Sequence, residues 1–260
     1  MLQGKTALVT GSTSGIGLGI AQALAAQGAH IVLNGFGDAK AAQDSVRASA
    51  GAQAIDISYH GADMSRPREI EEMLAFCAQR HGHVDILVNN AGIQHVAAIE
   101  DFPPEKWDAI LAINLSSAFH TTRLALPAMQ QANWGRIINI ASVHGLVGSA
   151  QKSAYVAAKH GIVGLTKVTA LENATTGITC NAICPGWVLT PLVQAQVDAK
   201  AQSAGISTEQ ATAQLLGEKE PSQQFTTPQE LGALAVFLCS EAANNIRGAA
   251  WSMDGGWTAQ

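Results

Sequence analysis

Three residues with the types and spacing of a proton-transfer site stand in the second half of the chain. Tyr155 and Lys159 are four residues apart in a helical segment, and Ser142 precedes Tyr155 by thirteen residues. Residues i and i+4 share one face of a helix, so the phenol and the ammonium are expected to lie together. A phenol has an ordinary pKa of about 10, and a nearby ammonium and an oxidised nicotinamide would both lower it. Tyr155 would then take a proton from an alcohol, or return it to a ketone, while Ser142 orients the same oxygen.

A glycine-rich turn joins the first apolar run to the first helical segment. The run TALVT (6–10) leads into TGSTSGIG (10–17), and helical periodicity follows over 16–27. Glycines at such a junction allow a tight turn and the close approach of a pyrophosphate, while the helix N-terminus offers free N–H groups. In this strand–turn–helix context the motif predicts a dinucleotide site. The expected cofactor contacts here are Gly11, Thr13, Ser14, Gly15, Ile16 and Gly17.

Further cofactor contacts are expected where the neighbouring strands end. Asp63, in GADMS, could bond the adenine amino group, and Asn90-Ala91-Gly92 leaves room for a ribose, although each position alone could equally be a turn or a cap. A 2′-phosphate would need Arg or Lys near Thr13–Ser14 or in the stretch 34–38, which includes Phe36, another expected contact. Asn34 and Asp38 stand in that stretch instead of a cation. The sequence therefore favours NAD over NADP.

Short apolar runs alternate with helical segments along the whole chain. Runs of this kind, apolar throughout, are typical of a parallel sheet that helices cover on both faces. Right-handed crossovers then give a single-domain, Rossmann-like, doubly wound α/β fold of about seven strands. The predicted strands are 6–10, 30–34, 54–58, 85–89, 136–141, 178–183 and 249–253, and segments such as 16–27 and 70–80 are predicted helices.

One domain is expected over residues 1–260, because no repeat, linker or compositional boundary divides them. Residues 190–222 break the alternation, since they are polar and rich in Ala and Gln with no strand following closely. This stretch follows the sixth strand, where ligands bind in open α/β sheets, and we interpret it as a helical lid over the substrate. An exposed excursion without a role is the alternative.

Composition and charge narrow the classes of partner. The 260 residues are 47% hydrophobic and 13% charged, with a formal net charge of −5 and no basic stripe, so nucleic acid and membrane surfaces are not expected partners. No apolar run reaches the length of a membrane span and no secretory signal precedes the first strand, which predicts a soluble, cytoplasmic protein. The four cysteines match no zinc or redox spacing and are expected to be buried thiols, and scattered histidines predict no metal site.

Taken together, these motifs resemble the short-chain dehydrogenase/reductase family. TGSTSGIG, NNAG (89–92), Asn114, Ser142, Tyr155-x-x-x-Lys159 and Pro185-Gly186 run in family order across nearly the whole chain. The resemblance implies that Asn114 anchors a water in a proton relay to Lys159. It also implies that Tyr155 and Lys159 contact the nicotinamide ribose, that Pro185, Gly186 and Thr190 seat the nicotinamide, and that the protein is a homotetramer.

The side chains around the motif residues indicate an acidic substrate. Gln94 follows NNAG, His144 follows Ser142 by two residues, Lys152 precedes Tyr155 by three, and Gln196 lies in the lid. All four donate hydrogen bonds and suit a carboxylate near the reacting carbon, with Lys152 supplying the charge. Lys152 alone could be a solvated loop residue, His144 could cap or pack, and His95 is expected to be structural or exposed. Apolar walls are expected from Trp187 and Trp257.

Within the family, the stretches GIQH, SVHG, AQKSAY, ICPGWVLTPLV and WSMDGGW resemble the members that oxidise (R)-3-hydroxybutyrate to acetoacetate with NAD. The resemblance implies that Gln94, His144, Lys152 and Gln196 hold the carboxylate, and that the two tryptophans pack on the methyl end. Two alternatives stay open. One is an NADPH-dependent reductase of 3-ketoacyl thioesters, in which Lys152 and His144 would have no clear task. The other is a nucleotide-binding regulator without catalysis.

Overall fold

The apolar runs form one parallel sheet at the centre of the protein. The computed structural model describes residues 1–217 and 219–259, and within them the strand order is β3-β2-β1-β4-β5-β6-β7. The strands are β1 (Thr6–Val9), β2 (His30–Asn34), β3 (Ile57–His60), β4 (Ile86–Asn89), β5 (Gly135–Ile140), β6 (Ile178–Pro185) and β7 (Ala250–Met253). The prediction of a doubly wound, Rossmann-like α/β fold is therefore confirmed.

The predicted position of the third strand is wrong by about three residues. The run 54–58 suggested the strand, but β3 begins at Ile57 and pairs with β2 from Ile31↔Ile57 to Asn34↔His60. The alternation of residue types around Asp56 is misleading, because the Asp56 carboxylate accepts hydrogen bonds from Arg80 outside the sheet. Polar side chains obscure the second half of the true strand. The fifth strand also ends earlier than predicted, at Ile140, so Ser142 lies just beyond it.

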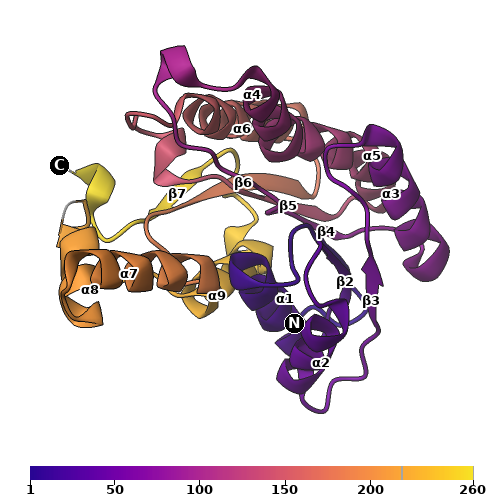
Figure 1. Cartoon of the computed structure of the whole chain (residues 1–260). Helices are drawn as coiled ribbons and strands as arrows, with labels where there is room; N and C mark the ends of the chain where they lie inside the picture. The colour runs from indigo at the N-terminus through magenta and orange to yellow at the C-terminus, as the bar shows by residue number, and fades with distance from the viewer. Residues whose placement is uncertain (218, 260) are drawn as a thin grey trace.

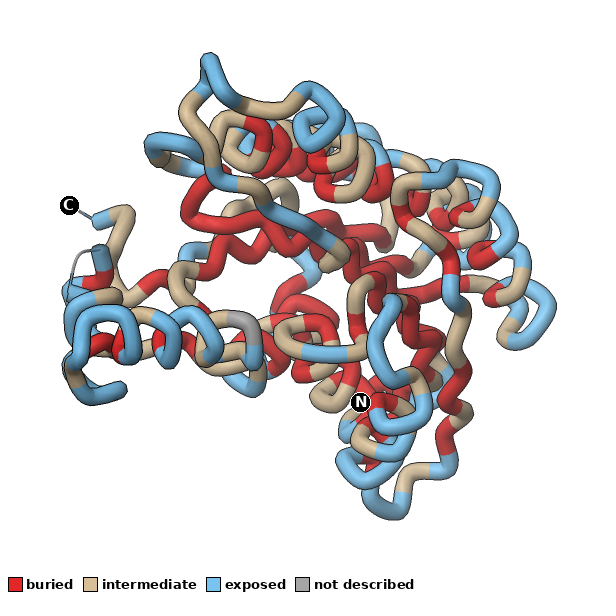
Figure 2. The backbone as a smooth tube through the Cα atoms, viewed as in Figure 1, coloured by how far each residue is buried: buried red, intermediate tan, exposed pale blue. Residues whose placement is uncertain are grey.

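Helices cover both faces of the sheet (Figure 1). One face carries α1 (Gly15–Ala26), α2 (Ala39–Ala50) and α9 (Pro228–Cys239), which share a buried core with β1 and β2. The other carries α3 (Pro67–His81), α4 (Pro104–Leu111), α5 (Ser117–Ala132) and α6 (Ser153–Glu172). The central strands β1, β4, β5 and β6 are buried throughout and red in Figure 2, as expected for a sheet that is covered twice, while the edge strand β7 is partly exposed.

The path of the chain places a ligand site at one edge of the sheet. From β1 the chain moves outward to β2 and β3, and then returns to β4 on the other side of β1. Open α/β sheets bind ligands beyond the carboxyl ends of the strands at such a reversal. The glycine-rich turn after β1 and the NNAG motif after β4 both lie at this edge.

The predicted lid is a pair of helices, α7 (Pro191–Ala204) and α8 (Thr208–Gly217), and residue 218 of that stretch lies outside the described residues. Val197, Ala201 and Ala211 bury themselves in a small core of their own, while much of the remaining surface of the pair is exposed (Figure 2). The two helices pack on each other, away from the centre of the sheet (Figure 1).

Short helical turns complete the chain. The structure has 3-10 turns at Ile99–Asp101, Val143–Gly145, Glu241–Ala243 and Trp257–Ala259, and a π-helix at Ala112–Ser116 between α4 and α5. Cys77, Cys180, Cys184 and Cys239 are free and buried, as expected. No helix among the described residues is long and apolar enough to cross a membrane.

Candidate active site

The glycine-rich turn after β1 is held against the segment that follows β4. Asn90 donates from its side-chain amide to the carbonyls of Thr10 and Gly11, at 2.9 Å each. A Cβ atom on Gly17 would lie 2.5 Å from that amide nitrogen, and one on Gly11 would lie 2.9 Å from the Ala91 Cα. Gly11 and Gly15 also have positive φ angles of 61° and 56°, a region that favours glycine. Two motifs that are eighty residues apart in the sequence therefore form one cradle.

The N-terminus of α1 is open to an anion. Its N-cap residue Ser14 makes no side-chain cap hydrogen bond, so the first N–H groups of the helix have no side chain to satisfy them. Free N–H groups and the positive end of the helix dipole together suit a phosphate. Thr190, at the N-cap of α7, lies close by, since its methyl group is 3.4 Å from a Cβ built on Gly15. The residues present thus fit the pyrophosphate of a dinucleotide.

Asn34 is a structural residue. It is fully buried at the end of β2, its Oδ1 accepts from the Gly11 N–H, and its Nδ2 donates to the carbonyls of His60 and Ala62. The side chain that the sequence places where an acidic residue is usual therefore fastens the turn to β3. Asp38 is occupied as the N-cap of α2, where its carboxylate accepts from Ala41 N–H at 2.9 Å. Between them Phe36 is 77% exposed.

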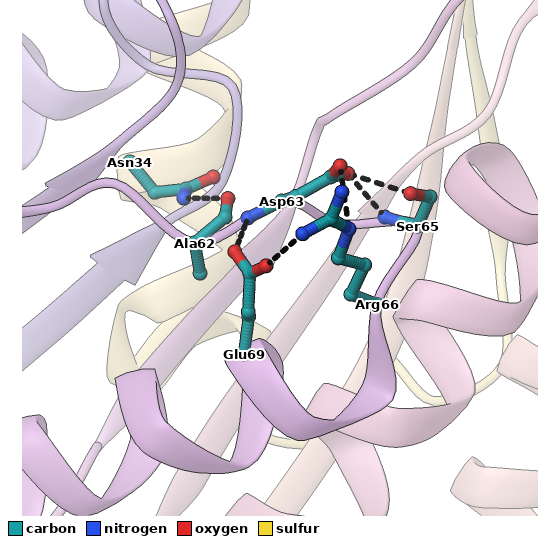
Figure 3. Close-up of polar contacts among 6 residues, drawn as sticks. All are labelled: Asn34, Ala62, Asp63, Ser65, Arg66 and Glu69. Atoms are coloured by element: carbon teal, nitrogen blue, oxygen red, sulfur yellow. Dashed lines mark hydrogen bonds and ion pairs between the residues drawn. The ribbon is translucent and has the colours of Figure 1, made fainter.

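Asp63 lies where the third strand leads into α3, as predicted. Figure 3 shows its carboxylate beside Ser65 and Arg66, while the Glu69 carboxylate accepts from the Asp63 backbone N–H. Oδ1 accepts from the backbone N–H and the hydroxyl of Ser65, and Arg66 Nε is 3.5 Å from Oδ2. The hydrogen bonds from Ser65, with help from the Arg66 charge, lower the pKa of Asp63. An ionised carboxylate at this edge retains acceptor capacity for an amino group.

Ser142, Tyr155 and Lys159 meet near the carboxyl end of β5. Ser142 is the N-cap of the turn Val143–Gly145, and the other two project from α6. Lys159 is buried, with its Nζ donating to the Ile140 carbonyl at 2.6 Å and lying 5.5 Å from the centre of the Tyr155 ring. The structure therefore brings together the three residues that the sequence singled out first.

The pKa of Tyr155 does not shift in the predicted direction within the chain alone. Burial raises it, and a hydrogen bond with Ser142 opposes that rise in part. Burial lowers the pKa of Lys159 to about 8, and its ammonium is directed to the Ile140 carbonyl. Desolvation disfavours every charged form, and at Tyr155 it outweighs the hydrogen bond with Ser142. The additional positive charge that the prediction invoked belongs to an oxidised nicotinamide.

Asn114 lies in the π-helix Ala112–Ser116, where it is buried. Its Oδ1 accepts from the Ile93 N–H and its Nδ2 donates to the Ile93 carbonyl, both at 2.9 Å. Single-turn π-helices are frequent at functional sites, and this one presents the Asn114 amide to the segment after β4. Periodicity in the sequence gives no sign of the extra residue in this turn.

Three aromatic contacts join expected substrate residues to one another and to Tyr155. The buried His144 ring lies edge-on to Tyr155 and to Trp257, with ring centroids 5.8 and 5.4 Å apart. Lys152 Nζ lies 5.9 Å from the centre of the Trp187 ring. Burial lowers the pKa of Lys152, and burial together with the charges of Lys152 and Lys219 lowers that of His144 to about 4.

Gln94 and Gln196 are both exposed, and within the described residues no hydrogen bond joins either side chain to His144 or Lys152. The segment that carries Gln94 is tied to the loop before Lys152, because Ala97 N–H donates to the Gln151 carbonyl at 3.0 Å. His95 packs edge-on against Phe102, in agreement with its expected structural role.

Comparisons with known proteins agree with this arrangement. The model of the short chain dehydrogenase family matches residues 5–201. The chain belongs to the short chain dehydrogenase family. The resemblance inferred from the motifs is thereby confirmed, and the chain is an oxidoreductase of the Rossmann type.

Two curated bacterial relatives match over almost the full length. The D-beta-hydroxybutyrate dehydrogenase of Cupriavidus necator is 74% identical over all of both chains. The enzyme of the same name from Rhizobium meliloti is 55% identical over 98% of this chain and 99% of its own. Among solved structures, a variant of actinorhodin polyketide ketoreductase with NADPH is 34% identical, covers 99% of each chain and has a TM-score of 0.88.

One residue of this edge has no counterpart in the sequence-based prediction. Glu220, just beyond α8, is buried and accepts a hydrogen bond from the backbone N–H of Trp187. A glutamate in a polar, Gln-rich stretch carries no signal of burial, so only the three-dimensional structure identifies it.

Proposed function

We propose that this dehydrogenase interconverts (R)-3-hydroxybutyrate and acetoacetate, with NAD as its cofactor. The observation that carries the proposal is the position of His144 beside Ser142 and Tyr155, with the Lys152 charge near enough to lower the His144 pKa, so that a neutral hydrogen-bond donor and a cation are available. The names of the two relatives that are 74% and 55% identical support the same substrate. An alcohol oxidised two carbons from a carboxylate needs both groups within one small site.

Tyr155 is the proton-transfer residue of the proposed reaction. Its phenolate oxygen takes the proton of the substrate hydroxyl as the alcohol becomes a ketone, and the reverse reaction returns that proton. NAD supplies the hydride acceptor at the carbon of the alcohol. Ser142 binds and orients the same oxygen, Lys159 favours the phenolate and holds the ribose, and Asn114 holds a water that passes the proton outward.

Four side chains are proposed to recognise the carboxylate. Lys152 supplies the charge and His144 a donor from its Nε2, which is buried and has no partner among the described residues. Gln94 and Gln196 are proposed to complete the set when α7 approaches the site. Trp187 and Trp257, which lie against Lys152 and His144, are proposed to pack on the methyl end.

NAD rather than NADP is proposed on grounds of charge. Asp38, Phe36 and Thr13 surround the end of β2, and no Lys or Arg occupies positions 34–38 to meet a 2′-phosphate. The other proposed contacts are Asp63 for the adenine, the cradle formed by Gly11–Gly17 and Asn90–Gly92 for the phosphates and ribose, and Pro185, Gly186 and Thr190 for the nicotinamide.

The homotetramer and the cytoplasmic location are also proposals. Apolar side chains on the outer surfaces of α5 and α6 support the association of several copies, among them Phe119, Val168 and Leu171. Exposed apolar groups gathered on helices are a common feature of subunit interfaces.

An assay of NADH absorbance tests the proposal. Purified protein is mixed with NAD and (R)-3-hydroxybutyrate, with the (S) enantiomer and NADP in parallel. We expect NADH to form only with the (R) acid and NAD. We expect Lys152→Ala to raise KM for the acid about tenfold or more, because a charge-assisted hydrogen bond is lost.

The matched control is Lys106→Ala, which removes an exposed lysine on α4 and should leave KM unchanged. Turnover of an uncharged 3-ketoacyl thioester with NADPH, and none of the hydroxy acid, would keep the role of Tyr155 and reject the carboxylate site. Absence of turnover with any substrate class, despite NADH binding, would favour a regulator.

A further inference from the structure

Glu220 is a buried carboxyl group that the proposed reaction does not use. It is 1% exposed, and its backbone N–H donates to the Leu216 carbonyl at 2.7 Å, which fixes it to the end of α8. Oε1 accepts a hydrogen bond from the Trp187 backbone N–H. Oε2 is buried and has no partner among the described residues.

Three segments of the site converge on this carboxyl. A Cβ atom on Gly186, after β6, would overlap Oε1, so only glycine leaves room there. A Cβ on Gly255, after β7, would lie 3.3 Å from Oε2, and the Gly255 carbonyl accepts from Ser222 N–H at 2.9 Å. Glu220 therefore lies between the end of the lid and the two loops that carry Trp187 and Trp257.

The surroundings of Glu220 do not favour its charge. Burial raises its pKa to about 7, the nearby Asp254 carboxylate adds to the rise, and the Trp187 N–H opposes it. Asp254 itself is engaged with Gly256 and Thr258. The loop at Gly186–Trp187 carries no charged side chain, and Lys219, next to Glu220 in the chain, is exposed. A neutral glutamine would make the same hydrogen bond without the cost of burying an ionisable group.

We propose that Glu220 is a positioning residue for the proposed dehydrogenase reaction, and that its carboxyl fixes the Trp187 backbone and so sets the apolar wall of the substrate site. The same bond steadies the neighbouring Pro185–Gly186 segment, which is proposed to seat the nicotinamide. Ionised Glu220 is the stronger acceptor, because hydrogen bonds to a charged group exceed those to a neutral one. Trp187 is thus held most firmly when Glu220 has lost its proton.

The test compares Glu220→Gln and Glu220→Leu with wild type and with Glu209→Gln, a control that changes an exposed carboxylate on α8. Glutamine keeps an acceptor for the Trp187 N–H, whereas leucine has none. We expect Glu220→Leu to raise KM for (R)-3-hydroxybutyrate at least tenfold with a smaller change in kcat. We expect Glu220→Gln to stay within about threefold of wild type, as rescue by a retained acceptor requires.

The pH profile gives a readout that a purely structural role would not move. For wild type, kcat/KM should rise through pH 7 as Glu220 ionises, and Glu220→Gln should lack that step. A folded Glu220→Leu with wild-type KM overturns the proposal. If Glu220→Leu does not fold, the proposal is overturned when the pH profile of kcat/KM for Glu220→Gln still rises through pH 7.

This inference rests on the proposed function, and a binding measurement separates the two. Energy transfer from tryptophan to bound NADH reports cofactor affinity without any substrate. If wild type does not oxidise 3-hydroxybutyrate, the proposed function fails. Weaker NADH binding in Glu220→Leu, but not in Glu220→Gln, would then still support the positioning of the Gly186–Trp187 segment, and equal binding in all variants would reject it.

Discussion

Ser142 Oγ lies 3.2 Å from His144 Nδ1 and also accepts a hydrogen bond from the His144 backbone N–H. The buried imidazole, with its pKa lowered to about 4, is neutral at physiological pH. With Nδ1 towards the serine hydroxyl as acceptor, the proton of the neutral ring is on Nε2, which is the nitrogen without a partner among the described residues. This contact thus orients both the hydroxyl proposed to hold the reacting oxygen and the donor proposed for the carboxylate.

A neutral His144 predicts that donor capacity matters at this position, and positive charge does not. His144→Gln retains an N–H donor and should change KM for the hydroxy acid by less than about fivefold, whereas His144→Leu should raise it about tenfold or more, since a hydrogen bond to a carboxylate is lost. Steady-state kinetics at pH 7.5 measure both values. Equal KM values in the two variants would contradict a donor role.

The same pKa shift has a consequence for stability. An unfolded histidine with a pKa of about 6.5 binds a proton that folded His144 does not bind until the pH is near 4, so folded-state stability is full above about 6.5 and falls on acidification. This group can contribute up to roughly 3 kcal/mol of the loss. Urea titrations of wild type and His144→Gln between pH 7 and 4.5 should show a shallower decline for the variant.

Replacing Lys159 is expected to lower activity but raise the stability of the fold. Burial lowers the pKa of Lys159 to about 8, so at pH 7 the folded chain holds an ammonium that the interior disfavours. Lys159→Met should abolish most turnover and raise the unfolding temperature at pH 7, although loss of the bond to Ile140 removes part of the gain. The difference in unfolding temperature between Lys159→Met and wild type should shrink as the pH rises from 8 towards about 10.5, where the unfolded lysine also loses its proton.

Calorimetry of wild type and Lys159→Met from pH 7 to pH 10 measures this difference. The exposed lysine Lys106 offers the control, because Lys106→Met replaces a solvated ammonium and should leave the pH dependence unchanged. A lower unfolding temperature for Lys159→Met at every pH would show that the buried ammonium stabilises the fold.

Most of the fold and the grouping of Ser142, Tyr155 and Lys159 could be predicted because their signals are local. A run such as HIVLN has an apolar centre from Ile31 to Leu33, and β2 occupies it from His30 to Asn34. Tyr155 and Lys159 needed only helical spacing to be placed on one face, and α6 supplies it. The glycines Gly11 and Gly15 in the turn after β1 could be predicted because the backbone there has positive φ angles, which glycine adopts most easily.

The rest depended on contacts that no local pattern encodes. Asn34 is fixed by bonds to the Gly11, His60 and Ala62 backbone, which only the pairing of β1, β2 and β3 brings together. The direction of the pKa shift of Tyr155 depends on how deeply α6 is buried. Glu220 meets Trp187 across thirty-three residues of sequence, and a polar segment gives no warning of such a contact.

The exposed ring of Phe36 marks the position where cofactor preference could be changed. It stands between Asn34, which is committed to the fold, and Asp38, which caps α2, so it can be replaced at little structural cost. Phe36→Arg should raise kcat/KM with NADP at least tenfold, because a guanidinium can pair with the 2′-phosphate. Phe36→Ala is the control for loss of the ring. Similar kcat/KM values with NADP for Phe36→Arg and Phe36→Ala would show that the 2′-position of the adenosine ribose does not lie near residue 36.

In the π-helix, the Asn114 side chain makes two hydrogen bonds to the Ile93 backbone, which a smaller side chain cannot make. If this amide also holds the relay water, Asn114→Ala should lower kcat about a hundredfold, the scale of an assisted proton transfer, with little change in KM for the hydroxy acid. Kinetics in both directions measure kcat, and Asn245→Ala, at an exposed asparagine, controls for the substitution itself. A kcat within threefold of wild type together with a lower unfolding temperature would assign Asn114 a role in folding alone. A lower kcat at an unchanged unfolding temperature would instead assign Asn114 a role in the proton relay, because the fold would then be intact while proton transfer is slowed.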